Sequence, residues 1–256
     1  MPTMASGRGS DIPLAGKASL PTSDLIVKSS GADFPGMAVN EYVCMSAARA
    51  AGLSVPEFHL SDNHQLFVMR RFDRTADGLP LGFEDMAALM GKGTQEKYDS
   101  SYERVARCIE LFCAEDHHAA GLAQLFDQVA LSCILGNGDA HLKNFGVLYS
   151  DPNQNDVRLA PAFDIVNTTG YIRDDQLALT LGGSKSLFAS RLHLIEFAGR
   201  CRVGEPAVRI TRLIEVVETA LKREQDLLKT VPGVQAALKA SFDAFASRFQ
   251  RRDGAT

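Results

Sequence analysis

An aspartate and an asparagine stand five positions apart in the loop Gly-Asn-Gly-Asp-Ala-His-Leu-Lys-Asn of residues 136–144. Phosphoryl transfer requires little covalent chemistry from the protein itself. It needs metal ligands, a cation near the phosphates and a carboxylate that orients the incoming hydroxyl. The spacing allows Asp139 to accept the proton of a substrate hydroxyl while Asn144 holds a magnesium ion. The segment therefore predicts a kinase-type catalytic loop with Asp139 as its catalytic residue.

Three further residues have the types and positions that complete such a site. A second magnesium ligand is expected downstream, after a short pair of strands, and Asp164 in Ala-Pro-Ala-Phe-Asp-Ile has that position. A lysine for the α- and β-phosphates is expected on a strand and is oriented by a helix glutamate, which makes Lys28 and Glu41 the pair that fits. Together these residues predict ATP and Mg²⁺ as cofactors.

Each of these residues also has a simpler interpretation. Asp139 could cap a turn between glycines, and Glu41 could be an exposed residue in the first turn of its helix. Lys143 could offset charge on the transferred group or be a solvated loop lysine. We interpret His141 as a structural histidine, because no second His/Asp cluster with ligand spacing accompanies it. The order of the residues along the chain, more than any one of them, favours the phosphotransferase.

The residues before position 75 predict a small α/β lobe. A start rich in Gly, Ser and Pro, without periodicity, indicates a loop over about the first twenty residues. An alanine-rich helix then stops at Gly52 and is followed by Pro56. The expected elements are a strand at residues 24–28, a helix at 39–51 and a hairpin with strands at 57–60 and 65–70.

The later residues predict a larger, mainly helical lobe. Apolar residues recur at helical spacing over residues 102–135, with a break expected near 116–121. Further expected elements are extended segments at 145–149 and 157–164 and helices at 205–228 and 234–249. The prediction is an α+β chain of two lobes, residues 1–74 and 75–256, with ATP bound between them.

Composition limits the possible classes of protein. The 256 residues are 45% hydrophobic and 23% charged, as in a soluble globular protein. The net charge of -4 argues against direct nucleic-acid binding, and no apolar run of membrane-spanning length or signal-peptide type is present, so we expect a cytoplasmic protein. We expect reduced core thiols at the five scattered cysteines, Cys44, Cys108, Cys113, Cys133 and Cys201.

Several segments resemble the C-terminal kinase region of the HipA family, the toxin kinases of bacterial toxin-antitoxin systems. The specific ones are RRFDR at residues 70–74, within FVMRRFDR at 67–74, and NGDAHLKNF at 137–145. Residues 25–28, 39–42 and 159–164 appear in the same order as in the family. The resemblance covers roughly residues 24–170 and implies a two-lobed protein-kinase-like fold and serine/threonine kinase activity.

The resemblance also implies roles for individual residues. Asp139 would accept the proton, Asn144 and Asp164 would bind magnesium, and Lys28, oriented by Glu41, would bind ATP. The remaining nucleotide-binding positions implied are the adenine-side hinge Arg70, Arg71 and Phe72, the phosphate-side His141, Leu142, Lys143 and Asn144, and Phe163.

The family further implies partners and a regulatory serine. Its members phosphorylate a protein substrate such as an aminoacyl-tRNA synthetase and are restrained by a HipB-like DNA-binding antitoxin. They also autophosphorylate a serine in a glycine-rich loop. Here the chain starts about where that loop should end and leaves only residues 6–10, Ser-Gly-Arg-Gly-Ser, as a candidate. We therefore expect a truncated or split protein, whose N-terminal subdomain could be a separate polypeptide.

Three other functions remain open. A small-molecule phosphotransferase would use the same catalytic residues. A module that binds nucleotide or antitoxin without turnover would fit the short N-terminus. A metal-dependent hydrolase would rest on Asp139, His141 and Asp164.

Overall fold

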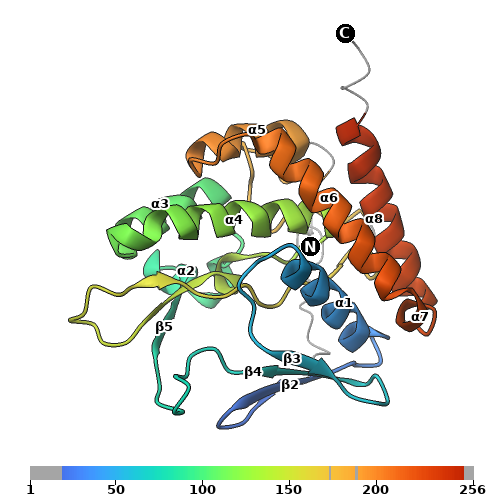
Figure 1. The fold of residues 1–256 in the computed structure, drawn as a ribbon, viewed down its shortest axis with the longest axis horizontal. Helices are drawn as coiled ribbons and strands as arrows, with labels where there is room; N and C mark the ends of the chain where they lie inside the picture. The colour runs from blue at the N-terminus through green and yellow to red at the C-terminus, as the bar shows by residue number, and fades with distance from the viewer. Residues whose placement is uncertain (1–18, 173, 188–189, 251–256) are drawn as a thin grey trace, which may run out of the picture.

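The computed structural model describes residues 19–172, 174–187 and 190–250, so the candidate serine loop at residues 6–10 lies outside the described residues. A small sheet lobe stands beside a larger lobe made mainly of helices (Figure 1). The first lobe consists of β1 (Ser19–Pro21), β2 (Leu25–Ser29), α1 (Met37–Ala50), β3 (Phe58–Leu60) and β4 (Leu66–Arg70). The second consists of β5 (Gly82–Asp85), α2 (Met86–Leu89), η1 (Thr94–Glu96), α3 (Tyr102–Phe112), α4 (Glu115–Leu135), η2 (Leu142–Asn144), β6 (Gly146–Tyr149), β7 (Arg158–Leu159), α5 (Ser190–Arg200), α6 (Pro206–Arg223), α7 (Gln225–Leu228) and α8 (Pro232–Gln250).

The first sheet is antiparallel, in the order β1-β2-β4-β3. Its register sets Lys28 of β2 opposite Phe67 of β4, and Ile26 opposite Met69. Paired residues share a face and side chains alternate along a strand, so these four lie on one side of the sheet. Phe67 and Met69 are buried there. Lys28 therefore points from β2 towards the interior, where α1 packs.

Helix α1 packs against β3 and β4 on one side and α6 on the other. It is buried along most of its length, including Glu41, which is 1% exposed. A carboxylate can be buried at tolerable cost only when a cation or hydrogen-bond donors satisfy it. The helix therefore holds Glu41 where it needs a partner, and Lys28 is the neighbour that supplies one.

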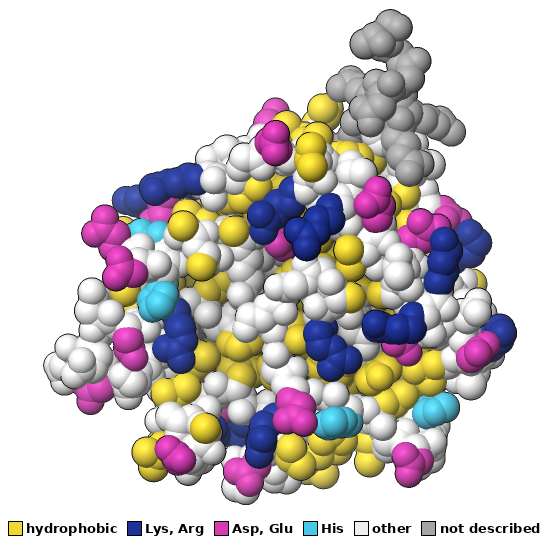
Figure 2. Space-filling view, in the orientation of Figure 1, with side chains coloured by type: hydrophobic (Ala, Val, Ile, Leu, Met, Phe, Trp, Pro, Cys, Tyr) yellow, Lys and Arg dark blue, Asp and Glu magenta, His cyan; other side chains and the backbone are white. Residues whose placement is uncertain are grey.

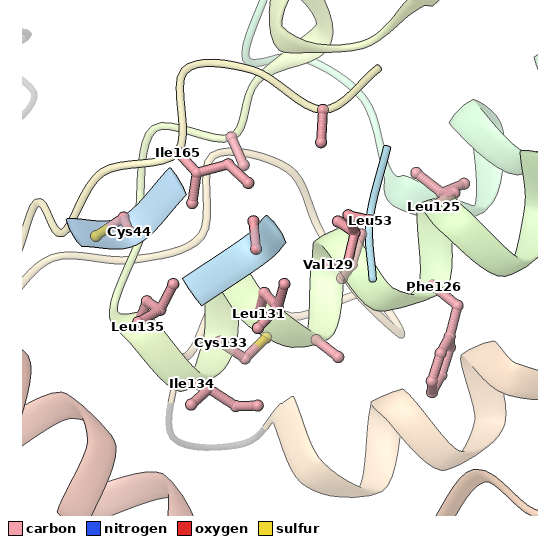
Figure 3. Close-up of a cluster of buried hydrophobic side chains, with 14 of the residues drawn as sticks. Cys44, Leu53, Leu125, Phe126, Val129, Leu131, Cys133, Ile134, Leu135 and Ile165 are labelled. Carbon is pink, nitrogen blue, oxygen red and sulfur yellow. The ribbon is translucent and has the colours of Figure 1, made fainter. Parts of the chain in front are cut away.

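Helix α4 forms the centre of the larger lobe and contacts α1, α3, α5, α6 and α8. All residues from Leu125 to Leu135 are buried, and most of them are apolar; the buried carboxylate of Asp127 is paired with Arg209. Figure 3 shows side chains of α4, among them Val129 beside Leu53, and Ile165 from another segment belongs to the same buried cluster. The predicted catalytic loop thus starts at the buried end of a long central helix.

A second antiparallel sheet joins β5, which precedes the predicted catalytic loop in the chain, to β6 and β7, which follow it. Strand β6 begins directly after η2, and β5 pairs with it although the two are about sixty residues apart in sequence. Ala160, just after β7, donates its N–H to the carbonyl of Gly146 at 2.9 Å. The pair β6-β7 thereby leads the chain from Asn144 to Asp164.

Several expected elements are confirmed. Strand β2, helix α1, the β3-β4 hairpin, β6 and α8 lie where the pattern predicts them, with ends shifted by one or two residues in most cases. The expectation of a loop over the first twenty residues fails at its end, because Ser19–Pro21 forms an edge strand paired with β2.

The two packed helices expected over residues 102–135 are confirmed as α3 and α4, but the break between them lies before the predicted residues 116–121. The chain leaves the helical conformation at Cys113 and Ala114, and Ala114 donates its N–H to the carbonyl of Val157 at 2.8 Å. Gly121 lies inside α4, where an added Cβ would stand 3.2 Å from Ile109 and 3.5 Å from Leu159. The glycine that suggested a break instead allows α4 to approach its neighbours closely.

Other differences arise from tertiary contacts. The helix expected at 205–228 divides into α6 and α7 at Glu224, whose φ of -90° and ψ of 12° depart from helical values. Strand β5 and the short helices α2 and η1 have too few residues to show periodicity, and α5 was not expected.

The five cysteines are confirmed as buried free thiols. Burial raises the pKa of Cys44, Cys133 and Cys201 to about 12 in each case. Thiols with such pKa values are poor nucleophiles at neutral pH. They therefore belong to the core and not to the chemistry of the protein.

Basic and acidic side chains are interspersed over the face shown in Figure 2, with hydrophobic side chains between them. Within the described ranges, no helix has the length and apolar character needed to cross a membrane.

Candidate active site

The catalytic loop is held in place by hydrogen bonds within itself. Asn137 accepts the N–H of Asp139 on its side-chain oxygen at 3.0 Å, which closes a tight turn. Asn144 accepts the N–H of His141 on Oδ1 at 3.1 Å. Both asparagines are buried. The loop is therefore an ordered turn that fixes Asp139 and Asn144 relative to each other.

A continuous chain of polar contacts joins the two lobes. Lys28 forms an ion pair with Glu41 on α1, and its Nζ also lies 2.8 Å from Oδ1 of Asp164. Asn144 donates from Nδ2 to Oδ2 of Asp164 at 2.9 Å. The structure thus brings together the four residues for which the sequence predicted roles in binding phosphate and metal.

Asp164 has a backbone conformation that is rare for a residue with a side chain. Its φ is 57°, in the left-handed region. Such a conformation costs of order 1–3 kcal/mol and persists where surrounding contacts impose it. Here the contacts with Lys28 and Asn144 fix the carboxylate, which is consistent with a functional position.

Asp139 contacts two residues on its outer side. The hydroxyl of Tyr98 donates to Oδ1 of Asp139 at 2.8 Å, and Nε2 of His141 lies 3.9 Å from the same oxygen. Burial lowers the pKa of His141 more strongly than the charge of Asp139 raises it, so the imidazole is neutral at neutral pH. Of these two contacts, only the bond from Tyr98 is a hydrogen bond. No pattern in the sequence indicated it.

Two further residues that the sequence did not predict, Thr168 and Asp175, support the predicted catalytic loop. Thr168 accepts the N–H of Gly138 at 2.6 Å and donates a short hydrogen bond to Asp175. A side chain at position 138 would collide with the carboxylate of Asp175 and stand 2.5 Å from the carbonyl of Gln176. Burial raises the pKa of Asp175, and the nearby charge of Asp139 adds to this effect. Gly138 is thus needed for close approach.

Asn40 and Asn167 form a third support. Asn40 on α1 donates to the carbonyl of Asn167 at 2.7 Å and accepts its N–H at 2.9 Å. The side chain of Asn167 donates to the carbonyl of Leu135, the last residue of α4, at 2.6 Å. The segment that carries Asp164 is therefore fastened to both lobes.

The predicted adenine-side residues separate into two groups. Phe72 stacks on Phe163 with ring centroids 4.9 Å apart, so these two are together and next to Asp164. Arg71 instead forms hydrogen bonds of 2.9 Å and 2.5 Å with Asp73 and holds the pKa of that carboxyl below its usual value. Arg70 is 66% exposed and lies 3.7 Å from a carboxylate oxygen on the neighbouring strand end, Glu57.

Two other loop residues have structural contacts. Lys143 pairs with Asp85, the N-cap of α2, at 2.6 Å, and its side chain is 41% exposed. Leu142 is fully buried and packs in the main core. Lys143 thus points towards α2.

The donor set at Asp164 and Asn144 fits magnesium, which prefers oxygen ligands and keeps several waters or phosphate oxygens. Asp164 offers a carboxylate and Asn144 an amide oxygen. A metal shared by the two would replace the hydrogen bond that joins them. In the described part of the chain, no three His, Cys, Asp or Glu residues gather as a metal cluster.

Comparisons of sequence point to one family. The sequence model of the HipA-like C-terminal domain matches residues 10–224. "Putative kinase Y4dM" of Sinorhizobium fredii is 30% identical over 219 residues, 79% of this chain and 51% of that protein. A "Putative kinase" of Haemophilus influenzae is 32% identical over 160 residues, 57% of this chain and 46% of that protein. The chain thus spans about half the length of these curated relatives.

Comparisons of structure agree in fold. A chain of the toxin-antitoxin complex of HipA, HipB and operator DNA from Shewanella oneidensis MR-1 matches with a TM-score of 0.73 and 19% identity, covering 91% of this chain and 61% of that one. The proinflammatory kinase CtkA of Helicobacter pylori matches with a TM-score of 0.56 and 15% identity, covering 93% and 96%. The expected two-lobed, kinase-like α+β fold is confirmed. Since the family model covers most of the sequence, the chain belongs to the HipA-like C-terminal domain family.

Proposed function

We propose that the chain is an ATP- and magnesium-dependent serine/threonine protein kinase in which Asp139 accepts the proton of the acceptor hydroxyl. One observation carries this proposal. The contacts from Glu41 through Lys28 and Asp164 to Asn144 connect a strand lysine, a helix glutamate and two metal-type ligands to the loop that holds Asp139. This is the set of groups that phosphoryl transfer from ATP requires.

In the proposed mechanism, each residue has a separate task. Lys28 binds phosphate oxygens, and Glu41 keeps it oriented and charged. Asn144 and Asp164 would hold magnesium, which would neutralise charge on the phosphates. Asp139 orients the acceptor hydroxyl and takes its proton as the oxygen attacks the γ-phosphorus. The ordered turn around Asp139 contributes because a prearranged base needs no reorganisation during the reaction.

The nucleotide site would extend from the phosphates to an adenine side. We assign Arg70, Arg71 and Phe72 to the hinge there, with Phe163 stacked beside it, and we assign His141, Leu142 and Lys143 to the phosphate side. The packing of Phe72 on Phe163 supports the first assignment. The boundary between the lobes would then lie near residue 74, after β4 and before β5.

Family membership supports a protein acceptor and a place in a toxin-antitoxin system, with a HipB-like antitoxin as partner and a cytoplasmic location. The structural relative from Shewanella oneidensis is a complex of HipA with HipB and DNA. Because this chain spans about half of its curated relatives, its acceptor, such as an aminoacyl-tRNA synthetase, and its antitoxin have to be established for the chain itself.

The decisive experiment measures ATP affinity and γ-phosphate transfer to protein by the purified chain with magnesium. Asp139→Asn should keep ATP affinity and lose at least about 100-fold in transfer, since general-base catalysis contributes roughly 10²–10⁴-fold. Asp77→Asn is the matched control, because Asp77 is an exposed loop carboxylate outside the site.

Each result has a definite meaning. Transfer that disappears only in Asp139→Asn supports the kinase. Binding of ATP without transfer in any variant would identify a nucleotide-binding module instead, and no ATP binding at all would overturn the site. A requirement for magnesium is tested in the same assay by adding a chelator.

A further inference from the structure

The hydroxyl of Tyr98 lies beside Asp139, where the acceptor hydroxyl of a substrate would bind in the proposed kinase reaction. This hydroxyl donates a hydrogen bond of 2.8 Å to Oδ1 of Asp139. An acceptor serine or threonine would donate the same type of bond to the same carboxylate before transfer. The distance lies within the ordinary range for O–H···O hydrogen bonds. The phenol is thus a substitute for an acceptor hydroxyl at the proposed base.

The backbone around Tyr98 is fixed while the end of its side chain can leave. Lys97 accepts the N–H of Leu142 at 3.1 Å, and Lys185 donates to the carbonyl of Tyr98 at 3.2 Å. The ring rests edge-on against His141, with centroids 5.2 Å apart. Yet Tyr98 is 36% exposed, so a change of side-chain rotamer could move the hydroxyl to solvent without disturbing the core.

We propose that Tyr98 is a gate on the acceptor side: its phenol covers Asp139 until an acceptor displaces it. This inference rests on the proposed function and adds a residue that selects the acceptor. A bulky group at the base also excludes water, the commonest competing acceptor. Only an acceptor that binds well enough to displace the phenol gains access to Asp139.

Removal of the gate should expose the proposed base to solvent. With the phenol gone, a water molecule can take the place next to Asp139. The water oxygen attacks the γ-phosphorus, its proton passes to Asp139, and ADP leaves with the electron pair of the broken phosphorus–oxygen bond. Loss of Tyr98 should therefore increase ATP hydrolysis in the absence of any added acceptor.

The test compares Tyr98→Ala, Tyr98→Phe and Tyr149→Phe with the unmodified chain. We measure magnesium-dependent ATP hydrolysis without acceptor and, by calorimetry, the affinity for a non-hydrolysable ATP analogue. Tyr98→Ala should raise hydrolysis about tenfold, the factor expected when one hydrogen bond to a charged group is removed, and leave nucleotide affinity unchanged. Tyr98→Phe keeps the ring, so its rate of ATP hydrolysis should rise less than that of Tyr98→Ala. Tyr149→Phe, at the end of β6, should hydrolyse ATP at the same rate as the unmodified chain.

The outcomes distinguish a failure of the gate proposal from a failure of the proposed kinase function. Adding Asp139→Asn to Tyr98→Ala should abolish the increase. No increase, or a decrease, with intact nucleotide affinity would overturn the gate and leave the kinase standing. Phosphate found on Tyr98 itself would make it an acceptor and also overturn the gate. If no variant binds the nucleotide, the proposed function fails and the gate fails with it.

Discussion

The charged side chains of the proposed site pair with one another. Lys28 is held by Glu41, which is 1% exposed, and by Asp164, which is 26% exposed. The pair with Glu41 is well shielded from water, whereas the contact with Asp164 is partly screened. We infer that an incoming phosphate would compete with Asp164 for the lysine, while Glu41 stays in place. Release of Asp164 would in turn free its carboxylate for magnesium.

Asp175 should make the stability of the chain depend on pH. Burial raises the pKa of Asp175 above its ordinary 3.8, so the folded state keeps this proton to higher pH than the unfolded state does. The free energy of unfolding then falls as pH rises from 3.8 through the raised pKa. Asp175→Asn cannot titrate, so its stability relative to the unmodified chain should increase across that window. Urea unfolding followed by circular dichroism at steps from about pH 3.5 to about pH 8 measures this difference.

The matched control for Asp175→Asn is Asp77→Asn, whose stability relative to the unmodified chain should stay constant over the same window. A relative stability of Asp175→Asn that is flat, or that falls with pH, would contradict burial as the dominant influence on Asp175. Thr168, whose hydroxyl donates to this carboxylate, acts in the opposite direction by favouring the charged form.

At the level of strands, helices and loops, the sequence was informative where a local pattern positions a residue. Lys28 on a strand and Glu41 on the next helix meet because strand alternation and helix burial direct both inwards. Asp139 and Asn144 share one loop, so their spacing was enough to pair them, and the order of the other site residues supported the prediction. Tyr98, Thr168 and Asp175 were not predicted because they reach the loop through tertiary contacts between segments 30 to 41 residues apart, for which spacing has no signal.

Helix boundaries show the same limit. Gly121 predicts a break by propensity, yet tertiary packing of α4 against its neighbours overrides that preference. The true break at Cys113 and Ala114 depends on a hydrogen bond from Ala114 to Val157, a residue of the distant β6-β7 connection. Strand β5 likewise exists because β6 pairs with it. Sequence periodicity cannot locate elements whose existence or ends depend on contacts with distant segments of the chain.

The link between α1 and the segment after Asp164 should be stabilising. Asn40 is fully buried and satisfies both the N–H and the C=O of Asn167. Asn40→Ala leaves these backbone groups without that partner, at about 1–3 kcal/mol each, so we expect the free energy of unfolding to fall by about 3 kcal/mol. Asn153→Ala, in an exposed turn, should change it by at most about 0.5 kcal/mol. Equal losses in the two variants, measured by urea unfolding, would contradict a specific role for Asn40.

Considered over the whole chain, the two lobes share one hydrophobic core. A single cluster of buried side chains includes Phe58, Phe67 and Met69 from the first sheet together with Leu131 and other residues of α4. Polar contacts between Lys28 and Asp164 and between Asn40 and Asn167 run beside it. Lobes joined by a continuous core are expected to unfold together, in contrast to domains connected by a linker.

Phe67 tests this cooperativity, because it lies in the sheet lobe, is fully buried and packs on Phe58 with ring centroids 5.7 Å apart. Phe67→Ala should cost about 3–5 kcal/mol, the range for deleting a buried aromatic ring. Differential scanning calorimetry should show one transition for the unmodified chain and one, at lower temperature, for the variant. Phe112→Ala, whose ring is 42% exposed at the end of α3, serves as control and should shift the transition far less. If the variant instead shows two transitions, the sheet lobe unfolds alone, and a site shared by both lobes would have to be assembled when a ligand binds rather than standing ready beforehand.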